Sequence, residues 1–188
     1  RSPAASCAAG RTPSSGAVEM EVALAGETLA LLPQCAAYWP RRRMLMVADI
    51  HCGKAASFRA AGVPVPSGTT AHNLGRLDAL LAAHDVAHIV FLGDFLHARA
   101  AHADATLTAL RHWRNQHPRL QLTLVRGNHD RHAGDPPPNL GLTLVDEPWI
   151  AAPFAFCHHP WRPAPRGSFD GSAWPVTGCH VIAGHLHP

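Results

Sequence analysis

The chain has 188 residues, a length that favours one compact domain over two. Hydrophobic residues make up 47% of the sequence and charged residues 15%, so there is ample material for a core and no signature of disorder. The net charge of +3, with histidines neutral, argues against a salt-driven grip on nucleic acid over the whole surface but allows a local basic strip. There are 15 histidines and a single tyrosine. Because histidine is the commonest side-chain metal ligand, this excess calls for a search for histidine clusters.

The cysteines form no CxxC pair, and an odd number does not suit a closed disulfide framework; the five are Cys7, Cys35, Cys52, Cys157 and Cys179. We therefore expect reduced thiols, most of them buried, in a cytoplasmic protein. No apolar run approaches the length of a membrane span, and the first residues lack the apolar stretch of a signal peptide. We expect residues 1–17 to be a flexible tail and residues 18–188 to form a single domain.

The predicted elements begin with three short strands. The segments EVALAG, ETLALLP and AAYWP predict an antiparallel meander joined by tight turns. The unbroken apolar run MLMVAD, residues 44–49, is typical of a strand buried on both faces. Thr69 and Thr70 can then cap a helix that runs to about Ala83. The residues expected on one face of this helix are Leu74, Leu77, Leu80 and Leu81.

Two further buried strands and another helix follow. AHIVFLGD, residues 87–94, predicts the second buried strand, and residues 102–116 predict a helix with apolar residues at helical spacing. LQLTLVRGNHD, residues 120–130, predicts a third strand, which leaves through Gly127. GLTLVD, PFAFCHH and CHVIAGH then predict short strands, with Pro160–Gly178 as a long surface loop. Alternating strands and helices followed by a strand-rich half predict an α/β fold, a two-sheet sandwich with helices outside.

Polar residues follow the predicted strands at once, where each strand ends. These positions are Asp49, His51, Asp94, Asn128, His129, Asp130, His158, His159, His185 and His187. In α/β folds, ligands bind in the crevice beyond the carboxyl ends of the strands. Each motif alone is more simply explained as a strand-end turn with solvated polar groups. Five strands that bring Asp, Asn and His to one edge are together better explained by a binding site.

The ligand types indicate a metal. In an extended segment residues i and i+2 face the same way, so Asp49 and His51 can bind one ion, as can His185 and His187. The carboxylate of Asp94 can bridge two cations through its two oxygens. Mixed oxygen and nitrogen ligands favour Mn²⁺, Fe or Zn²⁺ over calcium, which prefers all-oxygen sites.

The series DIH, GDF, GNHD, CHHP and GHLH resembles the calcineurin-like metallophosphoesterase superfamily over nearly the whole chain, from about Glu19 onward. HCGKAASFRAAGVPVPSGTT and GHLHP further resemble the bacterial DNA ligase-associated subgroup. The resemblance implies a four-layer α/β/β/α fold with two divalent metal ions, Mn²⁺ first and Fe or Zn²⁺ as alternatives. It also implies a link to DNA repair, with a DNA ligase or helicase as partner. Because the resemblance implies a further strand after the last motif, either the chain is truncated after Pro188 or further residues follow it.

Carried over by position, the resemblance implies a first metal held by Asp49, His51, Asp94 and His187. It implies a second metal held by Asp94, Asn128, His158 and His185. His158 is preferred to His159 because the family's ligand lies two residues before the proline, here Pro160. His159 is then expected to support the site or to lie at the surface. His129 resembles the family's catalytic histidine.

Two close cations would neutralise an anionic phosphodiester, lower the pKa of a shared water and align the attacking and leaving oxygens. Protonated His129 could stabilise the transition state and donate a proton to the leaving alkoxide. Protein phosphatases of the superfamily carry Asp three positions after the bridging Asp, where it orients this histidine; here that position is His97. The orientation of His129 is therefore open, and a phosphoprotein phosphatase is disfavoured. His97 is either a group near the site or a solvated loop residue.

Basic residues divide by position. Arg41–Arg43 precede a strand whose far end carries Asp49, so they are expected to face away from the metals in a solvated turn. Others follow the metal motifs and could line a path for a phosphate backbone, although an ordinary surface charge is the simpler interpretation of each; they are Lys54, Arg59, Arg99, Arg131 and Arg162. Trp161 and Trp174 could stack on bases or cover the core.

The leading hypothesis is a metal-dependent phosphodiesterase that acts on esters of nucleic acid or nucleotide type, a DNA-repair nuclease among them. Two alternatives stay open: a small-molecule phosphodiesterase or pyrophosphatase, and a non-catalytic module that binds phosphate or a DNA-processing partner. A complete ligand set together with His129 disfavours the non-catalytic module.

Overall fold

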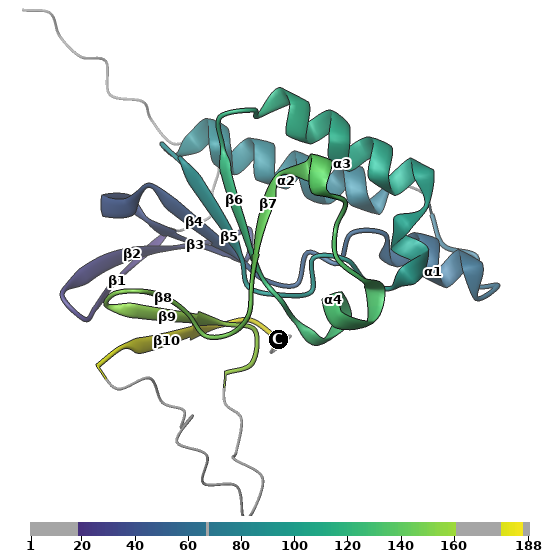
Figure 1. Cartoon of the computed structure of the whole chain (residues 1–188). Helices are drawn as coiled ribbons and strands as arrows, with labels where there is room; N and C mark the ends of the chain where they lie inside the picture. The colour runs from purple at the N-terminus through teal and green to yellow at the C-terminus, as the bar shows by residue number, and fades with distance from the viewer. Residues whose placement is uncertain (1–18, 67, 161–177, 186–188) are drawn as a thin grey trace, which may run out of the picture.

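Two β-sheets and one group of helices form residues 19–66, 68–160 and 178–185, the part of the chain that the computed structural model describes (Figure 1). The larger sheet has seven strands, in an order that follows the chain, and the smaller sheet has three. The helices cover one face of the larger sheet, and the smaller sheet lies against its other face (Figure 1). The predicted tail, residues 1–17, and nearly all of the predicted loop Pro160–Gly178 lie outside the described residues.

The chain starts with an antiparallel meander, as predicted. Its strands are β1 (Met20–Leu24), β2 (Glu27–Leu32) and β3 (Ala36–Trp39), followed by the antiparallel β4 (Met44–Val47). A single 3-10 turn, η1 (Pro40–Arg42), links β3 to β4. Arg41 pairs with Glu27, and Arg43 pairs with Asp85. These arginines lie at the amino end of β4, away from its carboxyl end as expected, but they form ion pairs rather than a fully solvated turn.

Four strands of the larger sheet are parallel, so their carboxyl ends share one edge. They are β4, β5 (His88–Phe91), β6 (Gln121–Val125) and β7 (Leu142–Val145). Their connections carry α1 (Lys54–Ala60), α2 (Thr69–Ala83), η2 (Arg99–His102), α3 (Asp104–Gln116), α4 (Asn128–Ala133) and η3 (Pro138–Leu140). Because parallel strands require such crossovers, each strand delivers the residues that follow it to the same edge.

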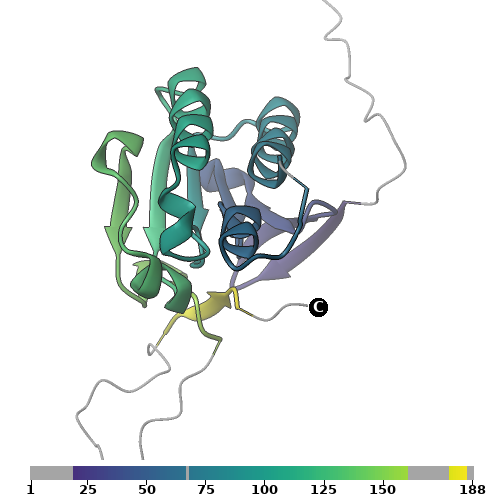
Figure 2. The ribbon, with the colours of Figure 1, turned by 90° about the vertical axis from the view of Figure 1, so that its right-hand side faces the viewer.

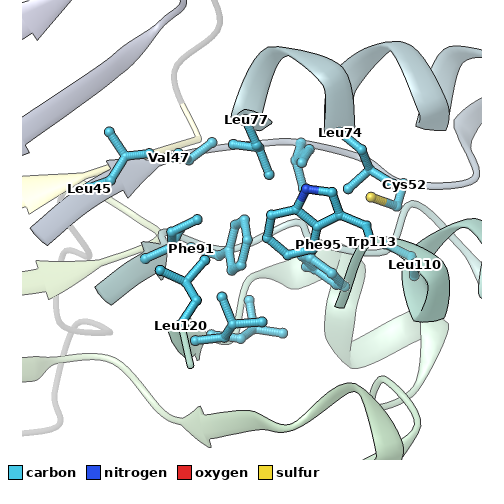
Figure 3. Packing of buried hydrophobic residues seen from close by; sticks show 14 of the residues in the cluster. Leu45, Val47, Cys52, Leu74, Leu77, Phe91, Phe95, Leu110, Trp113 and Leu120 are labelled. Atoms are coloured by element: carbon cyan, nitrogen blue, oxygen red, sulfur yellow. The ribbon is translucent and has the colours of Figure 1, made fainter. Parts of the chain in front are cut away.

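The helices lie against one face of the larger sheet (Figure 2), and the side chains that they turn toward it are apolar and buried. Members of this core include Leu74 and Leu77 of α2, Leu110 and Trp113 of α3, and Phe91 of β5, which Figure 3 labels, together with Leu80 of α2. Their three-residue spacing places the helical members on one stripe of each helix. Nε1 of Trp113 also donates a hydrogen bond to Asp78 at 2.7 Å, which joins α3 to α2.

The smaller sheet packs against the other face of the larger one. Its strands are β8 (Trp149–Ala151), β9 (Phe154–Cys157) and β10 (His180–Ala183), with β9 parallel to β10 and antiparallel to β8. Trp39 of β3 is fully buried between the sheets, where its ring meets Phe154 edge-on at 4.9 Å between centroids. The predicted two-sheet α/β architecture is therefore confirmed. The described ranges place no helix on the outer face of the smaller sheet.

One prediction about a helix start and one about a strand end are wrong. α2 has the predicted bounds, but its N-cap is Gly68, and no side chain caps it. Oγ1 of Thr70 instead accepts the backbone N–H of Gly53 at 3.0 Å. β6 ends at Val125, before the predicted end of the third buried strand, because α4 already begins at Asn128. The elements α1 and β8 have no counterpart among the predicted ones.

Two features bear on the environment of the protein. Cys35, Cys52, Cys157 and Cys179 are free thiols, but only Cys52 and Cys157 are buried, so the expected burial holds for two of these four. Burial raises the pKa of Cys52 to about 12 and so keeps its thiol protonated. No helix in the described ranges is both long enough and apolar enough to cross a bilayer.

We expect Phe154→Ala to lower the free energy of unfolding by about 3–5 kcal/mol, because it removes a fully buried ring between the two sheets. Ile150→Ala on the neighbouring β8 is the matched control, since that side chain is 50% exposed. The control should change the free energy by less than about 0.5 kcal/mol. Urea unfolding measures both, and equal losses would contradict the packing between the sheets.

Candidate metal centre

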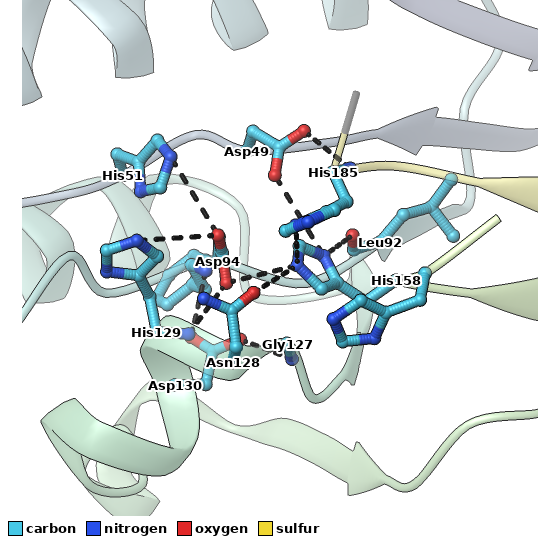
Figure 4. A network of polar contacts seen from close by, with 12 residues as sticks. Asp49, His51, Leu92, Asp94, Gly127, Asn128, His129, Asp130, His158 and His185 are labelled. Atoms are coloured by element: carbon cyan, nitrogen blue, oxygen red, sulfur yellow. Dashed lines mark hydrogen bonds and ion pairs between the residues drawn. The ribbon is translucent and has the colours of Figure 1, made fainter. Parts of the chain in front are cut away.

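Five strands bring their following residues together at one place, as Figure 4 shows. Asp49 and His51 follow β4, Asp94 follows β5, Asn128 and His129 follow β6, His158 follows β9 and His185 follows β10. Potential metal ligands therefore come from both sheets. His187, the remaining predicted ligand, lies outside the described residues.

His158 lies at the centre of one half of the site and is fully buried. Its Nδ1 is 3.0 Å from the carbonyl oxygen of Leu92, which can only accept a hydrogen bond, so Nδ1 carries the proton. In the neutral ring, the lone pair of Nε2 then faces Oδ1 of Asn128 at 2.8 Å and Oδ1 of Asp94 at 3.5 Å. Nδ1 of His185 is 3.0 Å from the same Nε2. Oxygen and nitrogen lone pairs that converge in this way fit a shared cation.

Asp49 provides a second sign of a cation. Its Oδ2 accepts the backbone N–H of His185 at 3.0 Å. Its Oδ1 is buried and has no hydrogen-bond partner among the described residues. A buried carboxylate oxygen without a partner is costly, and a bound cation would remove that cost. The donor chemistry therefore fits a metal ion.

His51 lies on the other side of Asp94, with its Nε2 3.9 Å from Oδ2 of that carboxylate. Burial lowers the pKa of His51 to about 4; the Asp94 carboxylate opposes the shift, and His97 adds to it. The ring is therefore neutral near pH 7, which is the form that binds metals. Asp49, His51 and Asp94 each offer one ligand atom, and these atoms lie within 4.8 Å of one another.

The backbone that presents these groups is left-handed rather than extended. The φ angles are +52° at Asp49, +47° at His51, +52° at Asp94 and +67° at His185. The predicted reason for pairing Asp49 with His51, an extended segment, is therefore wrong. Left-handed backbone at a residue other than glycine costs about 1–2 kcal/mol. Such strain clusters at functional sites, where the surrounding structure holds it in place.

Two glycines allow the strands to approach each other. A Cβ atom on Gly127 would lie 2.4 Å from Oδ1 and 2.7 Å from the backbone nitrogen of Asp94. A Cβ atom on Gly93 would lie 2.1 Å from Nδ1 of His158. Any larger residue at either position would displace Asp94 or His158.

Asp130 holds two loops of the site together through hydrogen bonds, although no role is predicted for it from the sequence. Its Oδ1 accepts the backbone N–H groups of Phe95 and Leu96 at 2.9 and 3.1 Å, and its Oδ2 accepts that of Gly127 at 2.9 Å. Burial raises the pKa of Asp130, and hydrogen bonds from Gly127 and Leu96 oppose the shift. The carboxylate thus ties the loop after β5 to the start of α4.

Glu147 is a supporting residue that the sequence predictions miss. Its Oε2 accepts the backbone N–H groups of His158 and His159 at 2.9 and 3.0 Å, and its Oε1 contacts Nδ1 of His159 at 2.8 Å. Burial alone would raise the pKa of Glu147, but these hydrogen bonds outweigh it and lower the pKa. Glu147 closely follows β7, so the strand-end rule that found the other site residues could have found it.

His129 is oriented without an aspartate. Its Nδ1 lies 2.6 Å from the backbone carbonyl oxygen of His97, so Nδ1–H donates to that oxygen. The two rings stack at 4.8 Å between centroids. Nε2 of His129 lies 4.0 Å from Oδ2 of Asp94, on a partly exposed side of the site. His97 therefore lies beside the site, and its main chain takes the place of the carboxylate that phosphatases use.

The chain is similar to a known protein family and to a solved structure. A family described as calcineurin-like phosphoesterase matches residues 42–188. The crystal structure of Pseudomonas putida nuclease MPE is similar with a TM-score of 0.76 and 45% sequence identity. The similarity covers 91% of this chain and 74% of the nuclease chain. No curated protein sequence matches significantly.

We expect Gly127→Ala to lower the free energy of unfolding by about 1–3 kcal/mol, because the new methyl group overlaps Asp94. Gly75→Ala on α2 is the control, since a Cβ atom there meets nothing within 4 Å. In a helix that replacement should stabilise by about 0.5–1 kcal/mol. Urea unfolding distinguishes the two, and a stabilising Gly127→Ala would refute the close approach.

Proposed function

The chain belongs to the calcineurin-like phosphoesterase family, and we propose that it hydrolyses phosphodiester bonds of nucleic acid at a site for two divalent metal ions. The observation that carries the proposal is the buried cluster of ligand atoms around Asp94. Nε2 of His158 and Oδ1 of Asn128 converge without a proton between them. Asp49 has a buried oxygen without a hydrogen-bond partner among the described residues, 3.9 Å from Nδ1 of His158. His51 faces the other oxygen of Asp94 and offers a nitrogen to a second cation.

We assign the ligands in two sets that share Asp94. The first set is Asp49, His51, Asp94 and His187, and the second is Asp94, Asn128, His158 and His185. The two oxygens of Asp94 support this sharing, because Oδ2 faces His51 and Oδ1 faces His158. The mixed carboxylate, amide and imidazole donors suit Mn²⁺, with Fe and Zn²⁺ as alternatives.

Two bound cations would supply charge neutralisation for the anionic diester and activation of a water molecule. The protein then has to orient the substrate and move a proton. His129 is placed for the second task, because its Nδ1–H is held by the carbonyl of His97 and its Nε2 points toward the Asp94 side of the site. We propose that protonated Nε2 of His129 donates to the leaving oxygen.

Nucleic acid is the proposed polymer because the similar Pseudomonas putida protein is a nuclease, and the choice of DNA rests on the resemblance to the ligase-associated subgroup. A place in DNA repair, with a DNA ligase or helicase as partner, rests on the motifs of the ligase-associated subgroup. The free thiols support a cytoplasmic location. Single-stranded DNA, cyclic nucleotides and dinucleotides should be compared as substrates, since preferential cleavage of the small esters would favour the small-molecule alternative.

Hydrolysis of bis-p-nitrophenyl phosphate should require added Mn²⁺ and should disappear in Asp94→Ala, because this change removes the carboxylate that both ions share. Asp85→Ala is the matched control: Asp85 is exposed and pairs with Arg43 at the amino end of the parallel strands. Metal content by mass spectrometry should fall in Asp94→Ala and stay at the wild-type value in the control. Activity of metal-free protein, or full activity of Asp94→Ala, would refute the proposal.

His129→Ala should retain bound metal but lose roughly 10²–10⁴-fold in kcat on DNA, where the leaving group is an alkoxide that needs a proton. The loss should be smaller on a p-nitrophenyl ester, because p-nitrophenolate leaves without protonation. Steady-state rates on both substrates, with metal content as the control, test this role. Equal losses on the two substrates would exclude His129 as the general acid.

A further inference from the structure

A cleft of about 450 Å³ runs from the metal centre toward α1. The residues that line it include Asp49, His51, Lys54, Phe58, Val65 and Pro66. One end of the cleft is therefore formed by proposed metal ligands and the other by apolar side chains. The volume lies within the range of small-molecule sites, roughly 300–1,000 Å³.

Phe58 of α1 forms an apolar wall of this cleft. Its side chain is 40% exposed, and it is the one aromatic among the exposed large hydrophobic residues of the described part of the chain. Its ring lies 6.1 Å from that of His97 between centroids. His97 in turn stacks on His129, so Phe58 lies two rings away from the proposed general acid. An exposed aromatic ring beside a site for a nucleic acid offers a π-face for stacking.

Lys54 adds a positive charge to the same cleft and is the sole lysine of the sequence. Within the described ranges no carboxylate lies within ion-pair distance of it, whereas Arg131 pairs with Asp146. Arg59, also on α1, hydrogen-bonds to the carbonyl oxygens of Val65 and Pro66 and so fixes the far rim of the cleft. Lys54 is thus available to an anionic ligand.

We propose that this cleft binds the nucleotide next to the scissile phosphate, with its base stacked on Phe58 and its own phosphate facing Lys54. The inference rests on the proposed function and adds a nucleotide subsite to it. Stacking is tolerant of sequence, because every base has a π-face. The cleft therefore favours single-stranded or unpaired nucleotides, whose bases are free to leave a stack.

Two diesters with the same leaving group distinguish binding of the base from catalysis. Thymidine 5′-p-nitrophenyl phosphate carries a base, and methyl p-nitrophenyl phosphate does not. Phe58→Ala should lower kcat/KM for the thymidine ester roughly tenfold more than for the methyl ester, mainly through KM. Phe58→Trp should keep the higher kcat/KM for the thymidine ester relative to the methyl ester. Phe58→Leu, which keeps apolar volume without a π-face, should lose this preference. Ile150→Ala, which truncates an exposed apolar side chain that does not line the cleft, should leave kcat/KM for both substrates unchanged.

Lys54→Gln tests the phosphate contact through salt dependence. The slope of log kcat/KM against log salt concentration for a single-stranded oligodeoxynucleotide should become shallower by about 0.7, and Lys54→Arg should restore it. Equal losses on both diesters in Phe58→Ala, or an unchanged slope in Lys54→Gln, would overturn the subsite. Failure of the wild-type protein to hydrolyse either diester would instead count against the proposed function.

Discussion

The hydrogen bond from Nδ1 of His158 to the carbonyl oxygen of Leu92 is the contact on which the site depends. It joins the end of β9 in the smaller sheet to the end of β5 in the larger sheet. Because the carbonyl can only accept, the bond also sets the tautomer and directs the lone pair of Nε2 toward Asn128 and Asp94. One interaction thus connects the packing of two sheets to the chemistry between them.

Holding this arrangement has energetic costs that the rest of the fold offsets. Four proposed ligands adopt left-handed backbone, and one carboxylate oxygen of Asp49 is buried without a hydrogen-bond partner among the described residues. Two other carboxylates, Asp130 and Glu147, bind backbone N–H groups on either side of the site and keep its loops in place. The apolar cores on both faces of the larger sheet supply the stability that such a strained, polar edge requires.

At position 97 this chain has His where the superfamily's protein phosphatases have Asp, and His129 is still oriented by the residue at this position. A carboxylate at this position would both orient the catalytic histidine and pair with its cation. The backbone carbonyl of His97 accepts the same proton from His129 but carries no full charge, so the orientation is kept without the ion pair. The side chain lies between Phe58 and His129, and its Nδ1 is 3.3 Å from Nδ1 of His51.

The sequence by itself determined the strand-end pattern and therefore the candidate site residues, because parallel strands place the residues that follow them at one edge of their sheet. The packing of the two sheets then brought the two edges together. Asp49, Asp94, Asn128, His158 and His185 could all be found in this way. Only the tertiary structure decided the left-handed backbone, the hydrogen bonds that Asp130 and Glu147 accept at the site, and the orientation of His129 by a carbonyl. These depend on contacts between segments far apart in the chain, and a backbone carbonyl is present at every residue, so no side-chain pattern can reveal which one a histidine will bind.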